Sequence, residues 1–86
     1  LGTLHVNEGA RRALVDRQAS LLQPGITGVD GSFGAMSVVR IVHDGVEFAR
    51  GQCSRDAATI HAALGSNERD QVVVHRDLLA LLQEAS

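Results

Sequence analysis

The residues of this 86-residue chain best suited to metal binding or nucleophilic chemistry are four histidines and one cysteine: His5, His43, His61, His75 and Cys53. Zinc sites usually collect such residues through short spacings, for example two histidines three to five residues apart. The four histidines are far apart in the chain, and none forms a short motif with Cys53. The sequence therefore predicts no metal site, histidines scattered over the surface or at strand ends, and a small semi-buried thiol.

The triplet His75-Arg76-Asp77 has the residue order of the catalytic triplet of protein kinases. In those enzymes an asparagine follows five residues after the aspartate, and a metal-binding Asp-Phe-Gly comes later. Neither motif is present, and the chain contains no lysine for a phosphate-binding Gly-Lys-Ser/Thr loop. We therefore predict no catalytic residue and no cofactor in this chain. In the structural interpretation, Asp77 pairs locally with Arg76 or a backbone amide, and His75 ends a strand.

The charge of the chain disfavours nonspecific binding to nucleic acid. Its formal net charge is −2, and its eight cationic side chains, all arginines, are scattered. Such binding needs a basic stripe that displaces counterions. One cysteine cannot form an internal disulfide, which suits a reducing compartment. No signal peptide and no apolar run near the roughly 20 residues of a membrane span is visible, so we expect a cytoplasmic protein without membrane contact.

Residues 38–51 predict a β-hairpin. Two alternating apolar runs flank Asp44-Gly45, a dipeptide typical of a two-residue type I′ turn because both turn residues need a positive φ. With this turn, His43 pairs with Val46 and Ile41 with Phe48. Val39, Ile41, Val46 and Phe48 then share one apolar face. Other segments must cover that face, because an isolated hairpin is only marginally stable in water.

The first third of the chain predicts a strand, a helix and a second strand. Residues 3–6 alternate like a strand, and Asn7 suits the N-cap of a helix over residues 8–18. Ala10, Ala13, Leu14 and Arg17 follow helical spacing. Pro24-Gly25 predicts a type II turn with a positive φ at the glycine, before a strand over residues 26–29.

The last third predicts a second helix and a closing segment. Ser54 is the expected N-cap of a helix over residues 55–64, and residues 71–75 have a strand pattern. Residues 78–82 are leucine-rich and fit either a helix or a closing strand. Together these elements predict a mainly β domain with two short helices and five to six strands in a barrel-like sheet.

Five segments of the chain resemble the PUA domain that follows the kinase domain in bacterial glutamate 5-kinases. They occur in the family's order and are spread along nearly the whole chain. They are Gly2-Thr3-Leu4-His5-Val6-Asn7-Glu8-Gly9-Ala10, Ser20-Leu21-Leu22-Gln23-Pro24-Gly25-Ile26, Val29-Asp30-Gly31-Ser32-Phe33, Asp44-Gly45-Val46-Glu47-Phe48-Ala49-Arg50-Gly51 and Val74-His75-Arg76-Asp77-Leu78. The family usually has a basic residue and Gly-Asp after the phenylalanine, so the conformation of residues 34–37 stays open.

The resemblance implies a PUA-like pseudo-barrel in which residues 71–74 and residues 78–82 are strands, with a helical extension at the very end. It also implies a single domain, residues 1–86, excised from the C-terminus of a longer kinase. That parent would phosphorylate glutamate in proline synthesis, with ATP and magnesium on its kinase domain. The expected partner is this kinase domain, and a homo-oligomer would form through the parent.

The alternative implied by the resemblance is an RNA-binding PUA module. In such modules RNA contacts the groove between the first helix and the second strand. The corresponding residues here are Arg11, Arg12, Arg17 and Gly25. Glu8 and Asp16 on the same helix, the negative net charge and the lack of exposed aromatics for base stacking weigh against this alternative.

Overall fold

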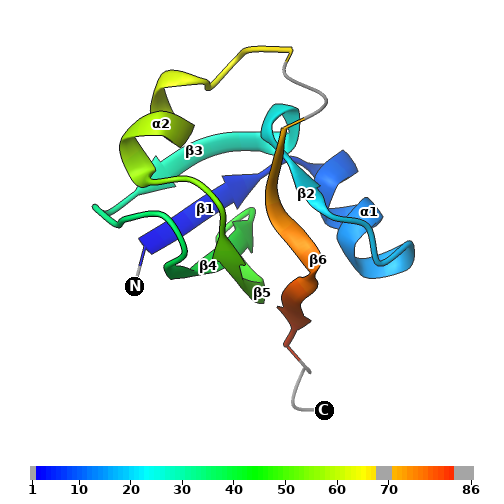
Figure 1. The fold of residues 1–86 in the computed structure, drawn as a ribbon. Helices are drawn as coiled ribbons and strands as arrows, with labels where there is room; N and C mark the ends of the chain where they lie inside the picture. Colours follow the sequence, from blue (N-terminus) through cyan, green and yellow to red (C-terminus); the bar gives the residue numbers. More distant parts are fainter. Residues whose placement is uncertain (1, 68–70, 83–86) are drawn as a thin grey trace.

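The structure is a computed structural model that describes residues 2–67 and 71–82. Strands dominate it, with one helix after the first strand and another before the last (Figure 1). The elements are β1 Gly2–Val6, α1 Glu8–Asp16, β2 Leu21–Leu22, the 3-10 helix η1 Gln23–Gly25, β3 Ile26–Asp30, β4 Val38–His43, β5 Val46–Cys53, α2 Ala57–Ala62 and β6 Val72–Leu81.

The strands form one sheet in the order β2-β6-β5-β4-β1-β3. β1 and β4 are parallel, and the other neighbours are antiparallel. The two outer strands, β2 and β3, are joined in the chain by η1 alone, so the sheet must curl until its edges approach each other. The expected mainly β pseudo-barrel with two short helices is therefore confirmed.

The predicted turn of the β4–β5 hairpin is confirmed. Asp44 and Gly45 have φ values of 52° and 80°, and His43 pairs with Val46 across the turn. These positive φ values match the type I′ geometry that suits the twist of the two strands.

The predicted pairing beyond this turn is wrong. The register shifts between Ile41 and Val42, so Ile41 lies opposite Ala49 rather than Phe48. This bulge directs Ala49 into the core and leaves Val46 60% exposed, while Phe48 packs at the core's margin. A bulge reverses which side chains of the bulged strand face inward, and alternation alone does not reveal it.

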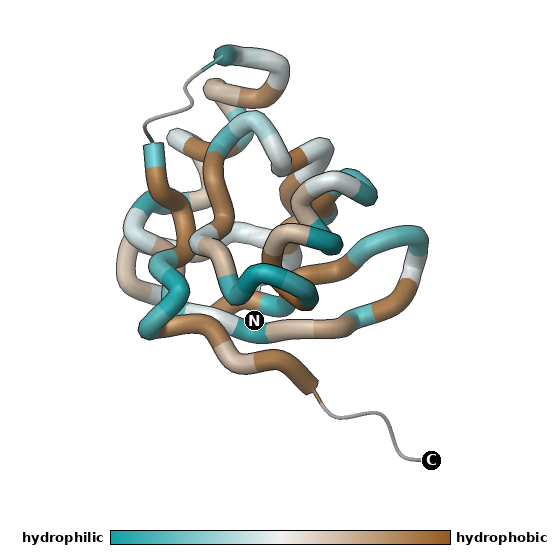
Figure 2. The backbone as a smooth tube through the Cα atoms, turned by 90° about the vertical axis from the view of Figure 1, so that its right-hand side faces the viewer, coloured by the Kyte–Doolittle hydropathy of each residue, from teal (hydrophilic) through white to brown (hydrophobic). Residues whose placement is uncertain are grey.

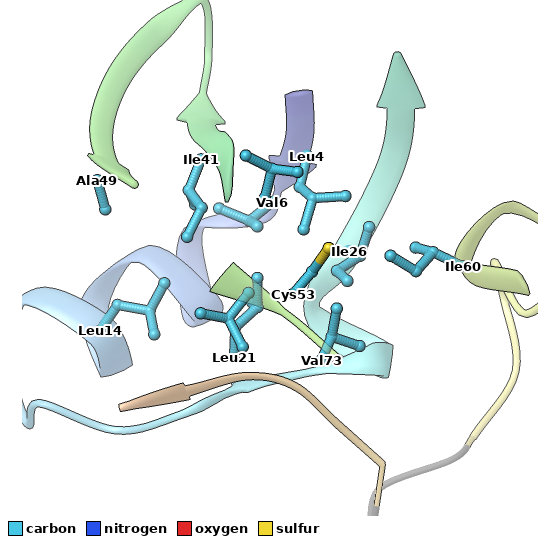
Figure 3. Packing of buried hydrophobic residues seen from close by; sticks show 12 residues of the cluster. Leu4, Val6, Leu14, Leu21, Ile26, Ile41, Ala49, Cys53, Ile60 and Val73 are labelled. Atoms are coloured by element: carbon cyan, nitrogen blue, oxygen red, sulfur yellow. The ribbon is translucent and has the colours of Figure 1, made fainter. Parts of the chain in front are cut away.

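The core is aliphatic and lies inside the curled sheet (Figure 3). Burying each large aliphatic side chain stabilises a fold by roughly 1.5–3 kcal/mol. The core residues come from all six strands and both α-helices: Leu4, Val6, Leu14, Leu21, Ile26, Val39, Ile41, Ala49, Cys53, Ile60, Val73 and Val74. Cys53, predicted to be semi-buried, is fully buried.

Both α-helices differ in detail from the prediction. α1 ends at Asp16 rather than at residue 18, because the chain turns away at Gln18, whose φ is 52°. α2 is capped by Asp56, which accepts a hydrogen bond from Thr59 N at 2.7 Å. Ser54, the predicted cap, instead donates from Oγ to the Val72 carbonyl at 2.8 Å.

The leucine-rich tail, for which the sequence allowed either a helix or a strand, is a strand. β6 runs without interruption from Val72 to Leu81, where the prediction had two strands, and Figure 2 shows the hydrophobic stretch near its end. The predicted terminal helical extension lies outside the described residues. Residues 34–37 form a turn in which Met36 has a φ of 70° and its amide donates to the Cys53 carbonyl at 2.7 Å.

Candidate functional site

A groove lies between α1 and the segment that forms β2 and η1. Its volume is about 270 Å³, and its walls are mainly small or apolar. We call it the α1 groove, and its lining residues are Ala10, Ala13, Ala19, Ser20, Leu21, Leu22, Pro24 and Gly25. The predicted RNA-binding face lay between the first helix and the strand over residues 26–29, and of its four candidate residues only Gly25 lines this groove.

Gly25 closes one end of the α1 groove by close approach to the helix. The predicted type II turn is wrong, because Gly25 ends η1 and does not have a positive φ. A Cβ at this position would lie 2.7 Å from the Cβ of Ala10. The Asn7 amide donates to the Gly25 carbonyl at 3.0 Å, and Asn7 also caps α1 by accepting from the Ala10 amide at 2.8 Å. The small residues here therefore bring the helix and η1 together.

Arg11 and Arg12, two of the predicted contact residues, converge on Glu8. Arg11 Nη2 lies 2.5 Å from Glu8 Oε1, and Arg12 Nε lies 3.1 Å from the same oxygen. The hydrogen bond from Arg11 is the largest cause that lowers the pKa of the Glu8 carboxyl to about 2. Part of the positive charge expected at this face is thus already matched by a carboxylate on the same helix.

His43 joins this cluster from β4. Its Nε2 lies 2.8 Å from Glu8 Oε2, and its Nδ1 lies 2.9 Å from the Val6 carbonyl. Both ring nitrogens of His43 therefore contact oxygen atoms of the first turn of α1 and the end of β1. His43 thereby ties the start of α1 to the hairpin, a role that the sequence did not indicate.

Arg17, the third predicted arginine, lies at the other end of α1. It lines a separate cavity of about 310 Å³ together with Gln18, Arg76 and Asp77. The four predicted residues therefore do not form one cationic face. Gly25 lies in the α1 groove, Arg11 and Arg12 gather at Glu8, and Arg17 faces β6.

The triplet His75-Arg76-Asp77 lies inside β6, so the prediction that His75 ends a strand is wrong. Asp77 makes its local contact with His75 instead of Arg76, since His75 Nδ1 lies 3.6 Å from Asp77 Oδ2. The same nitrogen accepts a hydrogen bond from the Asp77 amide at 3.1 Å. These exposed contacts stay within one strand and assemble no substrate-binding constellation.

The histidines are dispersed among different neighbours. His5 on β1 pairs with Asp30 on β3 at 2.5 Å, whereas His75 contacts Asp77 within β6. In the part of the chain that the structure describes, no three histidine, cysteine, aspartate or glutamate side chains gather as a metal site. No helix there is long and apolar enough to cross a membrane.

Gln23 is a buried polar residue that sequence reasoning passed over as part of a connector. It is 1% exposed, and its amide nitrogen donates to the Ile60 carbonyl at 3.2 Å. Its Oε1 accepts from Arg55 Nη1 at the same distance. These bonds join η1 to α2 across the molecule. A lone glutamine between Leu22 and Pro24 was the signal in the sequence, but its partners are more than 30 residues away.

The family model described as PUA domain matches residues 2–75. The chain is 46% identical over 85 residues to glutamate 5-kinase of Prochlorococcus marinus, covering 94% of this chain and 24% of that protein. It is 43% identical over 95 residues to glutamate 5-kinase of Frankia casuarinae, covering 98% and 26%. The chain thus spans about a quarter of the length of these curated relatives.

Solved structures share the fold. A PUA domain from Aeropyrum pernix, in complex with tartrate, superposes with a TM-score of 0.76 at 28% identity, over 86% of this chain and 41% of that chain. A PUA domain protein from Thermoplasma acidophilum gives a TM-score of 0.68 at 23% identity, over 85% and 46%.

Proposed function

We propose a function from the following premise: the chain belongs to the PUA domain family, whose model matches most of its length. On this basis the chain is the accessory domain of a glutamate 5-kinase. The parent enzyme would transfer the γ-phosphoryl group of ATP to the side-chain carboxylate of glutamate. ATP, magnesium and glutamate would bind the kinase domain, and the chain would act on regulation or assembly.

The observation that carries this proposal is the similarity to glutamate 5-kinases of several bacteria. It reaches 46% identity and extends over more than nine-tenths of the chain. The partner in this proposal is the kinase domain of the same longer protein, and any homo-oligomer would form through that parent. A cytoplasmic location belongs to the same proposal, because ATP and glutamate are cytoplasmic substrates.

The test compares the parent enzyme with a version that lacks these 86 residues. We expect the shortened enzyme to retain glutamate-dependent ADP formation, with altered inhibition by proline or an altered oligomeric mass. The 86-residue chain by itself should form no ADP with ATP, magnesium and glutamate. Turnover by the chain alone, or a shortened enzyme unchanged in rate, proline response and mass, would contradict the proposal.

A second and less favoured candidate function is RNA binding, for which the α1 groove would offer a contact surface. In this case Arg11, Arg12, Arg17 and Gly25 would contact the RNA. Because contacts between arginines and the RNA phosphates release counterions, the affinity for RNA should fall steeply as the salt concentration rises. A titration of fluorescent single-stranded RNA at low salt tests this, with Arg11→Gln/Arg12→Gln as the weakened variant. Unchanged anisotropy at tens of micromolar protein, on the order of the affinities of weak nonspecific binding, would exclude it.

A further inference from the structure

Two adjoining cavities lie between the C-terminal end of α1 and β6. The polar cavity of about 310 Å³ is lined by Arg17, Gln18, Arg76 and Asp77. The second cavity, of about 270 Å³, has Leu14, Leu79 and Leu81 in its walls. Because Gln18 and Arg76 line both cavities, we treat them as one cleft and call it the α1–β6 cleft.

The backbone around this cleft is held in a defined arrangement. The Arg76 amide donates to Ser20 Oγ at 2.9 Å, which anchors β6 to the segment after α1. Gln18 has a φ of 52°. This left-handed conformation follows directly on the C-cap of α1, where a residue with a positive φ commonly ends a helix. Gln18 lines both the polar and the apolar part of the cleft.

The two arginines of the cleft differ from the other arginines that the structure describes. Arg11 and Arg12 pair with Glu8, and Arg40 and Arg50 pair with Glu47. Arg55 bonds to the side chains of Gln23 and Gln71.

Arg17 and Arg76 have no carboxylate within 4 Å among residues 2–67 and 71–82. Asp77, which shares their cavity, contacts His75 instead. Two exposed arginines from distant parts of the chain therefore line one cavity together with Asp77, and neither is paired with a carboxylate of the described residues.

The chemistry of the cleft specifies a class of ligand. Guanidinium groups bind carboxylates and phosphates through paired hydrogen bonds. Two arginines and one aspartate leave the polar part with one net positive charge, which suits a singly charged carboxylate better than a doubly charged phosphate. The leucine walls suit the apolar part of such a ligand. The volume of each of the two cavities is near the low end for ligand pockets, which is roughly 300–1,000 Å³.

We propose that the α1–β6 cleft binds a short aliphatic carboxylate. Arg17 and Arg76 hold the carboxylate group, Gln18 donates a further hydrogen bond, and the aliphatic part lies against Leu79 and Leu81. This site is independent of the kinase assignment, because it depends only on the residues of this chain.

The test uses 4-methylpentanoate as the probe and 4-methyl-1-pentanol, its uncharged counterpart of similar shape, as the matched ligand. Amide NMR spectra of the chain are recorded during titration to about 10 mM, a range suited to the weak affinity of a small ligand. We expect saturable shifts at Gln18, Arg76 and Leu79 with the acid and none with the alcohol. Arg76→Gln and Arg17→Gln should each weaken binding about tenfold, as for the loss of roughly 1.4 kcal/mol.

Arg40→Gln is the matched control, because Arg40 lies on β4, is paired with Glu47 and lines neither part of the cleft. It should bind the acid like the unmodified chain, and the dispersion of the amide spectrum shows whether each variant is folded. The proposal is overturned by equal shifts with acid and alcohol, by shifts confined to Ala10 and Gly25, or by no saturable shift at all. Shifts at the cleft with a short RNA but not with the acid would likewise overturn it.

Discussion

Cys53 has a buried thiol that donates a hydrogen bond to a backbone carbonyl. The side chain is 0% exposed, and Sγ donates to the Ser37 carbonyl at 3.3 Å. Burial raises the pKa of the Cys53 thiol above its ordinary value, because the core solvates a thiolate poorly. Nucleophilic chemistry needs the thiolate, so this environment makes Cys53 a core residue and an inert one.

The folding stability should therefore fall at alkaline pH through Cys53. Since the pKa is raised in the folded state, the contribution of the neutral thiol is complete below the ordinary pKa of 9.0 and is lost as the pH rises through the folded value. The chain has no lysine and no tyrosine, so Cys53 is the one side chain expected to titrate between about pH 8 and pH 11. Thermal unfolding across this range should show a falling midpoint for the unmodified chain and a flat one for Cys53→Ala. An equal decline of the unfolding midpoint in both proteins would contradict the assignment of this pH dependence to Cys53.

At the scale of the element, α1 is short and depends on its first turn. It has nine residues, and isolated helices below about 12–15 residues are marginal in water. Asn7 satisfies the Ala10 amide, Glu8 gathers Arg11, Arg12 and His43, and Leu14 is buried in the core. The same helix forms one wall of the α1 groove and contributes Leu14 to the α1–β6 cleft. Both candidate sites therefore depend on the stability of the first turn of α1.

Replacing Asn7 by alanine should lower the free energy of unfolding by about 1 kcal/mol, because the Ala10 amide loses its acceptor. Chemical denaturation measures this change. Asn7→Ser is the matched control, since serine is also a good N-cap and should restore most of the loss. If alanine and serine have the same effect, the cap does not contribute as the structure indicates.

At the scale of the whole molecule, the curled sheet depends on a close crossing of β5 and β6. A Cβ at Gly51 would lie 2.5 Å from Val74 Cγ1 and 3.0 Å from the Leu78 carbonyl oxygen. The register between the two strands shifts at this point, between Gly51 and Cys53. Glycine therefore lets the end of β6 lie close against β5, while the start of β6 pairs with β2 at the edge of the sheet.

Gly51→Ala should lower the free energy of unfolding by roughly 1–3 kcal/mol, the usual cost of overpacking a core. Gly9→Ala provides the comparison, because its Cβ would approach no closer than 3.5 Å to Asn7 Oδ1 and alanine favours a helix. Gly9→Ala should leave the denaturation midpoint unchanged or raise it. Equal stabilities for the two variants would mean that the crossing tolerates a side chain.

Features that depend on a few neighbouring residues were predictable from the sequence. The Asp44-Gly45 turn and the Asn7 cap form from atoms within three residues, so composition and spacing were sufficient. The resemblance to PUA domains added the strand assignment of residues 78–82, which helical and strand propensities left open. Of the contact residues that the resemblance implied, only Gly25 lines the α1 groove.

The sequence by itself determined most of the helices and strands, the aliphatic core and the family resemblance of this chain, because alternation, caps and turns are local properties. Only the tertiary structure decided which side chains meet. The bulge after Ile41, the approach of Gly25 to Ala10 and the cavity shared by Arg17 and Arg76 each depend on how the sheet curls. Such contacts result from the packing of the whole core, and no short stretch of residues encodes them.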